Sequence, residues 1–357
     1  MTMKTVKCVV WDLDNTLWNG TLLEGDDVQV TAEARHLLEL LDSRGILQAV
    51  ASKNDHDHAW AKLEQLGVAD YFVAARIGWS VKSESVRQIA EELRFAESTI
   101  AFIDDQPAER AEVEYHRPDV RCYDAARIPE LGALPDLTPP VVTADSRNRR
   151  GMYRAAARRD SAREEHTGPD ADFVRSLDLV MRIEHATEEH LLRVEELTLR
   201  TSQMNATGVH YSLEALRALL DDPAHRVLVV SMADRFGPHG AVGVVLMEVG
   251  GPAWHLKLLA TSCRVVAFGA GAVLLRWLDD QAARAGAHIL ADFRRTERNR
   301  MMEIAYRFSG FTDDDCACRA ALGFAGDGLQ RLHLVTAEQP PPDTMTLEAP
   351  EPAGTAR

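Results

Sequence analysis

The chain has 357 residues and a formal net charge of −15 at pH 7, and 46% of its residues are hydrophobic. This length and apolar content favour two globular domains. The acidic balance argues against a nucleic-acid-binding protein, which would need a basic face. Because the sequence has no run of about 18 apolar residues and no basic leader before an apolar segment, we expect no membrane span, no signal peptide and a cytoplasmic location.

Strands and helices alternate over the first third of the chain. The expected elements are strands over 6–14, 46–52, 71–77 and 99–105, and helices over 33–45, 55–67 and 83–95. In the first helix, Ala34, Leu37, Leu38 and Leu41 share one apolar face. This alternation predicts an α/β domain over residues 1–130, with a parallel sheet and helices on both faces.

The character of the sequence changes after residue 130. Residues 131–172 are first proline-rich and then highly charged, which predicts a linker with a polar helix. A second domain is expected over 173–338, with a hairpin over 225–250, strands over 254–262, 288–293 and 329–336, and helices over 269–287 and 299–311. The Pro- and Glu-rich tail, 339–357, is predicted to be disordered.

The five cysteines are scattered, which is typical of free thiols in a reducing compartment. Cys316 and Cys318 form a C-A-C pair, but no second ligand pair accompanies them in the sequence. We therefore expect no zinc site at this pair.

Polar side chains follow several strands of the first predicted sheet. Asp12 and Asp14 end the first strand, Ser52 ends the second, and Asp104 lies at the end of the fourth. In open parallel sheets, ligands bind beyond the carboxyl ends of the strands, so these side chains should converge. Converging carboxylates suit Mg²⁺, and a hydroxyl with Lys82 beside them suits the oxygens of a transferring phosphoryl group.

The order D-x-D-x-T, then serine, lysine and a DD pair, resembles the haloacid dehalogenase (HAD) superfamily. The resemblance implies that Asp12 is a nucleophile that attacks phosphorus and that Asp14 is the general acid/base. It further implies two sets of ligands: Ser52, Asn54 and Lys82 for the phosphoryl group, and Asp12, Asp14 (through its main-chain carbonyl), Asp104 and Asp105 for Mg²⁺. Lys53 is a rival to Lys82, which we prefer because it begins the helix one crossover later.

The intervals between these motifs are short. About 40 residues separate Asp14 from Ser52, and about 30 separate Ser52 from Lys82. Neither interval can hold a cap domain. We therefore expect a capless, Rossmannoid HAD-like domain with an open site, the kind that often acts on phosphoryl groups carried by macromolecules.

A cysteine precedes a glycine-rich turn in the second domain. The segment around Cys263, with Gly269 and Gly271 after it, resembles the pyrophosphate-binding turn of GNAT acyltransferases, where helix N–H groups cradle an anion. A simple helix cap explains the glycines equally well. Cys263 itself is either a buried small hydrophobe or a thiolate nucleophile, whose pKa the helix N-terminus and Arg264 would lower.

Several long segments, among them VVWDLDNTLWNGTLLEGD, RTSQMNATGVHY and TSCRVVAFGAG, together resemble the FkbH-like family over residues 4–337. Its members join a HAD phosphatase of subfamily IIIC to a GNAT-like acyltransferase domain. The resemblance implies a glyceryl transferase/phosphatase for polyketide biosynthesis. Such an enzyme takes a glyceryl unit from 1,3-bisphosphoglycerate onto Cys263, dephosphorylates it and loads it on the phosphopantetheine arm of an acyl carrier protein, towards extender units such as methoxymalonyl.

Further substrate-binding candidates are Arg264, Asn205, Arg200, His210 and His255, and the two histidines are also candidate bases for Cys263. The sequence departs from the family where Ala267–Gly269 replaces a G-R-G turn, which removes an arginine and a glycine. Two alternatives remain open. The chain is either a Mg²⁺-dependent phosphatase whose second domain only docks a carrier protein, or a binding module without catalytic activity.

Overall fold

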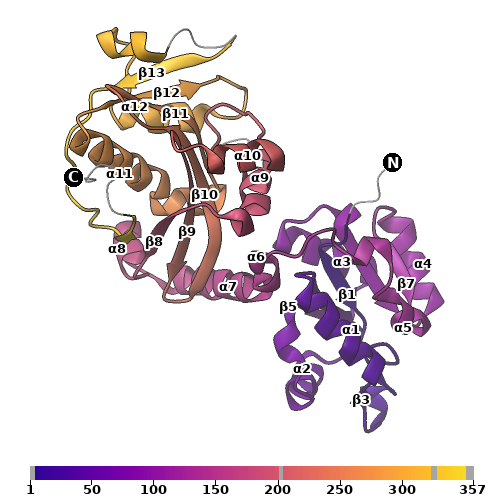
Figure 1. Ribbon diagram of the computed structural model, residues 1–357. Helices are drawn as coiled ribbons and strands as arrows, with labels where there is room; N and C mark the ends of the chain where they lie inside the picture. The colour runs from indigo at the N-terminus through magenta and orange to yellow at the C-terminus, as the bar shows by residue number, and fades with distance from the viewer. Residues whose placement is uncertain (1–4, 201–203, 323–327, 351–357) are drawn as a thin grey trace. The chain divides into compact units, whose positions relative to one another are not determined.

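The computed structural model describes residues 5–200, 204–322 and 328–350. The chain folds as two compact units, Met1–Ala157 and Arg158–Arg357. The boundary lies within helix α7 (Arg149–Glu165), inside the segment that was expected to link two domains. Each unit has one main sheet with helices packed on it (Figure 1). Among the described residues, no helix combines the length and apolarity needed to cross a membrane.

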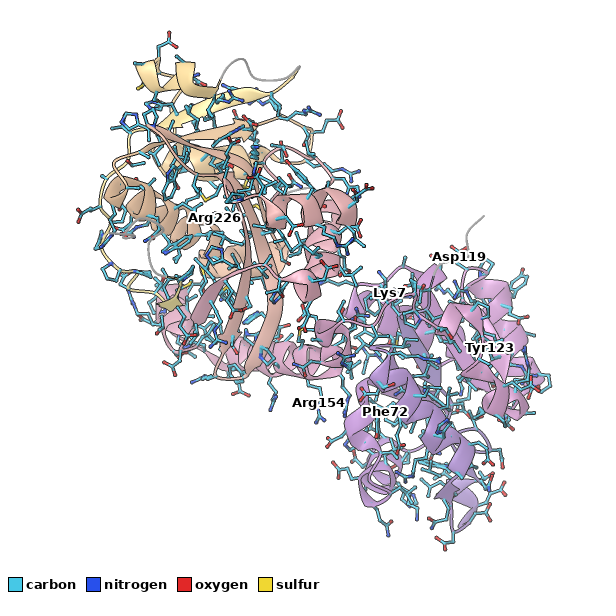
Figure 2. All side chains as sticks on the ribbon, viewed as in Figure 1. Lys7, Phe72, Asp119, Tyr123, Arg154 and Arg226 are labelled. Atoms are coloured by element: carbon cyan, nitrogen blue, oxygen red, sulfur yellow. The ribbon has the colours of Figure 1, made fainter. Side chains whose placement is uncertain are left out.

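The first unit is built on a parallel sheet. Its strand order is β5-β4-β1-β6-β7, and every neighbouring pair is parallel. Phe72 on β5 and Tyr123 on β7 mark the two edge strands (Figure 2). The strands are β1 (Cys8–Trp11), β4 (Leu47–Ser52), β5 (Phe72–Ile77), β6 (Ile100–Asp104) and β7 (Arg121–Asp124).

Helices cover both faces of this sheet. Val9 and Trp11 of β1 pack with α1 and α2 in one core, whereas Cys8 and Val10 pack with α3 and α4 in another. This division follows the alternation of side chains along a strand and explains why β1 is apolar throughout. The helices are α1 (Ala32–Ser43), α2 (His56–Gln65), α3 (Lys82–Leu93), α4 (Pro107–His116), α5 (Ile128–Leu131) and α6 (Ala144–Arg147).

A small flap is the only insertion between β1 and α1, in a stretch that the structure describes in full. It consists of β2 (Trp18–Asn19) paired with β3 (Gln29–Val30). No cap domain lies between β4 and α3 either, since α2, a short 3₁₀ turn over Ala69–Tyr71 and β5 fill this fully described stretch. The capless HAD-like fold predicted for the first unit is confirmed.

The second unit has a seven-stranded mixed sheet in the order β13-β12-β11-β10-β9-β8-β14. Strands β11 and β12 are parallel and joined by α11, and the predicted hairpin is formed by β9 and β10. This is the GNAT-like α/β fold that the sequence predicted. The strands are β8 (Val180–His185), β9 (His225–Asp234), β10 (Gly237–Glu248), β11 (Ala253–Thr261), β12 (His288–Phe293), β13 (Gln330–Leu334) and β14 (Thr346–Glu348).

The mixed sheet also has two cores. One face packs against α11 and α12, and the other packs against α9 and α10. The large apolar residues of α11 recur at helical spacing and are buried, among them Leu274 and Leu278. The helices of this unit are α8 (Asp170–Arg175), α9 (Leu191–Arg200), α10 (Leu213–Asp221), α11 (Ala270–Arg284) and α12 (Arg300–Phe308).

Two expectations about irregular segments were wrong in part. Leu131 and Leu137, in the proline-rich stretch, are buried in the first unit's core, so this stretch is packed rather than a free linker. Residues 346–348, in the predicted disordered tail, form β14, which the sequence analysis had missed. This strand pairs in parallel with β8. Short edge strands with charged residues lack the apolar run that marks a buried strand.

Candidate active sites

The polar residues of the first unit meet at the carboxyl edge of the parallel sheet. Asp12 directly follows β1, Ser52 ends β4, and Asp104 ends β6, and these three strands are neighbours in the order β4-β1-β6. Lys82 is the first residue of α3. All four residues are buried. The sheet topology therefore places the predicted HAD residues on one rim.

Lys82 joins the two central carboxylates. Its Nζ donates to Asp12 Oδ1 at 2.5 Å, to Asp104 Oδ2 at 3.1 Å and to the carbonyl oxygen of Ala51 at 2.9 Å. Lys53, the rival, instead donates to Glu109 Oε1 at 2.6 Å on a partly exposed surface. Lys82 is thus the lysine that can stabilise charge beside Asp12.

The carboxylates form a group suited to a divalent cation. One oxygen each from Asp12, Asp104 and Asp105 lies within 4.8 Å of the others. Oδ1 of Asp105 is buried and has no hydrogen-bond partner in the part of the chain that the structure describes. Such an atom normally has a partner, so a bound ion would account for its orientation. Hard oxygen ligands of this kind fit Mg²⁺.

Burial sets the ionisation of this group. Desolvation raises the pKa of Asp12 to about 6, against the opposing attraction of the Lys82 ammonium, and the charge of Asp104 acts in the same direction as burial. Desolvation and the charge of Asp104 also raise the pKa of Asp105. Burial alone would lower the pKa of Lys82, but Asp12 and Asp104 together raise it above its ordinary value, so this lysine stays charged.

Asp14 is held by three N–H donors. Its Oδ1 accepts from Trp18 Nε1 at 2.7 Å and from the Leu22 backbone N–H at 3.0 Å, both in the flap. Its Oδ2 accepts from Asn54 Nδ2 at 3.0 Å. The carboxylate lies outside the cation cluster, which agrees with a metal role for its main-chain carbonyl alone. Asn54, which was expected to bind phosphate, donates to Asp14, and the sequence analysis had missed the contact from Trp18.

Other residues fix the rim itself. Thr16 Oγ1 accepts from the Asp105 backbone N–H at 3.0 Å, and Asp104 Oδ1 accepts from the Gln106 backbone N–H at 2.8 Å. The carbonyl of Ser52 accepts from the Gly78 N–H at 3.0 Å, which ties the end of β4 to the loop before α3. Thr16, the threonine of the D-x-D-x-T motif, thus helps to hold the Asp104–Asp105 pair in place.

In the second unit, Cys263 begins the 3₁₀ turn η7 (Cys263–Phe268) directly after β11. The structure does not describe its side chain. Gly269 ends this turn with φ of +72° and leads into α11, so the glycine serves the helix cap that was considered as an alternative. Thr261 is the last residue of β11, two residues before Cys263. Its hydroxyl is buried and has no hydrogen-bond partner among the described residues.

Asn205 lies next to the end of β11. It forms a bridge with Ala260, and the Thr261 N–H donates to the carbonyl of Met204 at 2.9 Å. The side-chain Oδ1 of Asn205 accepts from the N–H groups of Thr207 and Gly208, so the side chain holds this turn. The buried Asn299, which was not among the predicted site residues, donates from Nδ2 to the Asn205 carbonyl at 3.1 Å.

Among the remaining candidates, His255 lies far along the sheet from Cys263. His255 lies near the start of β11, six residues before Thr261, so the extended strand separates the two by about 20 Å. Its Nε2 is 2.8 Å from Asp292 Oδ2. His210 is 3.1 Å from the Thr198 hydroxyl. Arg264 Nε donates to Ser262 Oγ at 3.3 Å, and the side chain of Arg200 lies outside the described residues.

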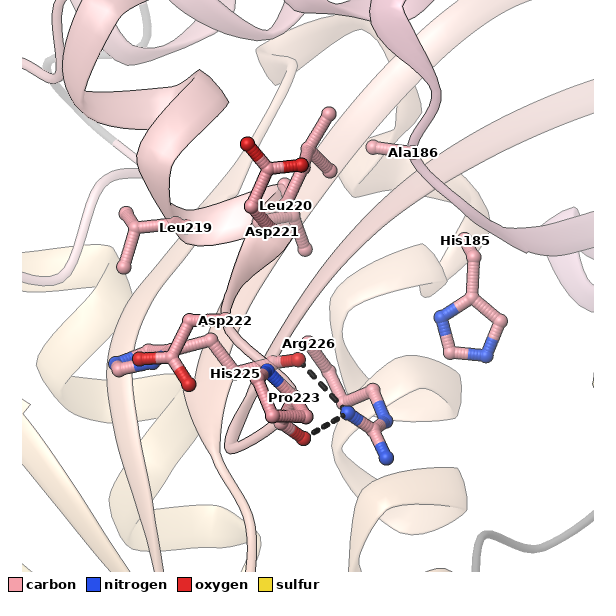
Figure 3. Close-up of a pocket in the computed structure, with 10 residues that line it drawn as sticks. His185, Ala186, Leu219, Leu220, Asp221, Asp222, Pro223, His225 and Arg226 are labelled. Atoms are coloured by element: carbon pink, nitrogen blue, oxygen red, sulfur yellow. Dashed lines mark hydrogen bonds and ion pairs between the residues drawn. The ribbon is translucent and has the colours of Figure 1, made fainter.

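An open pocket occurs at the other end of this sheet (Figure 3). It lies where β8 ends and β9 begins, beside the end of α10. Arg226 Nη1 donates to the carbonyls of Pro223 at 2.7 Å and His225 at 2.9 Å there. None of the predicted site residues lines this pocket.

Comparisons with known proteins bear on the first unit most directly. A family model described as haloacid dehalogenase-like hydrolase matches residues 19–112, a range that begins after Asp12 and Asp14. No curated protein matches the chain significantly. One similar solved structure is the N-terminal part of a Bacteroides fragilis protein containing a phosphatase domain, in complex with Mg, at 28% identity and a TM-score of 0.33. That match covers 35% of this chain and 38% of the other.

Two further solved structures are similar to separate parts of the chain. A HAD-superfamily hydrolase from Ehrlichia chaffeensis is 14% identical, with 37% of this chain and 98% of that chain covered and a TM-score of 0.31. A spermidine N-acetyltransferase from Vibrio cholerae, in complex with CoA and spermine, is 14% identical, with 44% and 96% covered and a TM-score of 0.33. The strand order and the carboxylate cluster of the first unit agree with the match of residues 19–112 to the haloacid dehalogenase-like hydrolase model.

Proposed function

We propose that the chain is a bifunctional glyceryl transferase/phosphatase. It takes the acyl group of 1,3-bisphosphoglycerate onto Cys263, removes the remaining phosphate at Asp12 and delivers the glyceryl unit to the phosphopantetheine thiol of an acyl carrier protein in polyketide biosynthesis. The FkbH-like segments of the sequence support the substrate and the partner. The HAD-like site supports the phosphatase half.

The first step of this proposal is acyl capture. The thiolate of Cys263 attacks the acyl carbon of the mixed anhydride, the bond from that carbon to the phosphate oxygen breaks, and inorganic phosphate leaves. The product is a thioester of 3-phosphoglycerate on the enzyme. In the last step the carrier thiol, as its thiolate, attacks this carbonyl, and the Cys263 thiolate leaves.

Dephosphorylation belongs to the first unit. A carboxylate oxygen of Asp12 attacks phosphorus, the ester P–O bond breaks, and Asp14 gives its proton to the leaving alkoxide. Asp14 then takes a proton from the water that hydrolyses the aspartyl phosphate, which restores both residues. Lys82 balances charge on the phosphoryl oxygens throughout. Mg²⁺, held by Asp12, Asp104 and Asp105, would supply further neutralisation of phosphoryl charge when bound.

The observation that carries the phosphatase half is the contact of one buried lysine with two carboxylates from neighbouring strands, beside the unpartnered oxygen of Asp105. A structural ion pair alone would not account for an unpartnered buried oxygen beside it. Asp14, fixed by the flap and by Asn54, supplies the proton-transfer group that a phosphatase needs.

Intact-protein mass spectrometry tests the whole scheme. The purified chain is incubated with 1,3-bisphosphoglycerate and Mg²⁺ and its mass is compared with that of Cys263→Ala and Asp12→Asn. We expect a glyceryl adduct on the wild type, none on Cys263→Ala, and a phosphoglyceryl adduct that persists on Asp12→Asn.

Cys122→Ser serves as the matched control, because it removes a partly buried thiol of the first unit and should keep the adduct. An adduct that persists on Cys263→Ala would end the nucleophile assignment. Mg²⁺-dependent release of phosphate from small esters without any adduct would leave a plain phosphatase, with the second unit as a docking module.

A further inference from the structure

A second group of candidate metal-binding side chains lies in the second unit, at the opposite end of β11 from Cys263. It consists of His288, Cys316, Cys318 and His333, whose candidate ligand atoms all lie within 4.8 Å of one another. We propose that these four residues bind a zinc ion, which fastens the segment 312–322 to the sheet. This inference is independent of the proposed function.

The two histidines meet because of the register of neighbouring strands. His288 begins β12, and His333 lies on β13, where it pairs with Leu290 in an antiparallel ladder. Side chains two residues apart on a strand share a face, so His288, Leu290 and His333 point to the same side. Ile289 and Leu334 point to the other side and pack in the core with α11 and α12.

The two cysteines come from the segment that crosses this face. Cys316 precedes the 3₁₀ helix η8 (Ala317–Leu322), and Cys318 lies within it. Cys318 packs with Leu290 and Ala253, so the segment lies on the sheet at the histidines. A backbone bridge between Thr312 and His333 fixes where the segment starts.

The distances suit a tetrahedral ion. His288 Nδ1 lies 3.0 Å from His333 Nε2 and 3.5 Å from Cys316 Sγ. In a tetrahedral site with Zn–N of about 2.0–2.1 Å and Zn–S of about 2.3 Å, neighbouring ligand atoms are about 3.3–3.8 Å apart. Small movements therefore admit the ion. Two thiolates with two imidazoles form a set that zinc favours over the hard cation expected at Asp12.

Burial and position indicate a structural role. His333 and Cys318 are buried, and His288 and Cys316 are partly buried. Four protein ligands leave no open position for a substrate or water. The site also lies at the start of β11, since Ala253 pairs with His288, whereas Cys263 follows the other end of that strand. The ion would therefore take no part in acyl transfer.

The segment has few apolar contacts with the sheet, and its other contacts are polar, among them Arg307 with Asp313 and Arg331 with the Leu322 carbonyl. Asp313, Asp314 and Asp315 precede the cysteines and are exposed, and the apolar cluster beneath them is small. Zinc bound at four side chains contributes free energy directly to the folding of such a stretch. This reverses the expectation from sequence, which failed because the two histidines are far from the C-A-C pair along the chain and are joined to it only through strand register.

Metal analysis of the full-length chain tests the proposal. Protein is produced in zinc-containing medium, passed over a chelating resin, and measured by inductively coupled plasma mass spectrometry. We expect about one zinc ion per chain for the wild type and at least a tenfold lower content for Cys316→Ser and Cys318→Ser. Asp12→Asn and Cys122→Ser are matched controls that should keep the zinc.

Cobalt gives a second readout that does not depend on the variants folding. Wild-type chain stripped of zinc and titrated with Co²⁺ should develop the visible bands of tetrahedral cobalt and a thiolate-to-cobalt charge-transfer band in the near ultraviolet. Wild-type protein without zinc and without this spectrum would overturn the proposal. Zinc content unchanged in both cysteine variants, or lost in Asp12→Asn alone, would also overturn it.

Discussion

The two units differ in how their functional residues come together. In the first unit, Asp12, Ser52 and Asp104 end neighbouring parallel strands, so the topology alone brings them to one rim. In the second unit, the sheet is mixed, and His255 lies at the opposite end of β11 from Cys263. In a parallel sheet, the residues that follow successive strands therefore lie at the same edge and can form one site. In a mixed sheet, such residues can lie at opposite edges. The predictions below test this contrast.

The largest effect is expected at the lysine that joins the carboxylates. Lys82→Ala removes the charge beside Asp12 and should lower kcat for Mg²⁺-dependent phosphate release by about 10²–10³-fold. Lys53→Ala, which breaks only a contact with Glu109, should change it less than about threefold. Equal losses in the two variants would show that position on the rim does not select the catalytic lysine.

A smaller loss is expected where Asn54 positions the acid/base. Asn54→Ala removes one of the three donors that hold Asp14, so kcat should fall about tenfold while KM stays within about twofold. Asn54→Asp should be worse than alanine because it places a second carboxylate against Asp14. A rise in KM with unchanged kcat would instead favour the phosphate-binding role first expected for Asn54.

The second unit offers a test by pH. Burial alone would raise the pKa of Asp234, but hydrogen bonds from His239 and Arg159 hold it well below its usual range. Because the folded pKa lies below the unfolded value of about 3.9, this stabilisation is complete above roughly pH 4 and is lost as pH falls towards the folded pKa. The melting temperature of this unit should fall accordingly on acidification.

Asp234→Asn checks the cause of that pH dependence. The variant should lose about 3 kcal/mol of stability at pH 7, since Arg159 is left buried without its carboxylate. Its melting temperature should then vary less with pH below 5, measured by circular dichroism. If the melting temperature of the variant depends on acidic pH as that of the wild type does, other carboxylates cause the dependence.

The smallest effect concerns the open rim of the first unit. Trp79, with 72% of its surface exposed, lies three residues before Lys82, and the exposed Leu23 follows Leu22 of the flap. Large exposed aromatic residues often anchor a protein partner. Trp79→Ala should raise KM about threefold for a carrier-bound phosphoester and leave turnover of a small phosphoester unchanged. A loss on both substrates would place Trp79 in the fold of the site instead.

Sequence reasoning predicted the polar cluster of the first unit because most of its residues directly follow a strand and Lys82 begins a helix. It identified Asp12, Asp14, Ser52, Lys82 and the DD pair, and it excluded a cap from the short intervals. It did not predict that Asn54 donates to Asp14, because a side chain that follows a strand can turn to a neighbour as well as to a ligand. The hydrogen bond from Trp18 to Asp14 depends on how the flap folds back, which cannot be read from the spacing of residues in the sequence.

The second unit shows where such reasoning stops. Its fold was predictable from the hairpin, the glycine turn and the helical stripe of α11. The convergence of His288 and His333 with the C-A-C pair was not, because it depends on the register of β12 with β13 and on the path of a loop. Asn205 illustrates the same limit, since its side chain is used by a local turn that its position in a motif did not indicate.

The joint use of both units is the central claim, and the mass of the carrier protein tests it most directly. Carrier protein with its phosphopantetheine arm is incubated with the chain, 1,3-bisphosphoglycerate and Mg²⁺, and its intact mass is measured. We predict a gain equal to one glyceryl group without phosphate, absent with Cys263→Ala. An unmodified carrier protein, in a reaction where the chain still releases phosphate from simple esters, would contradict the account.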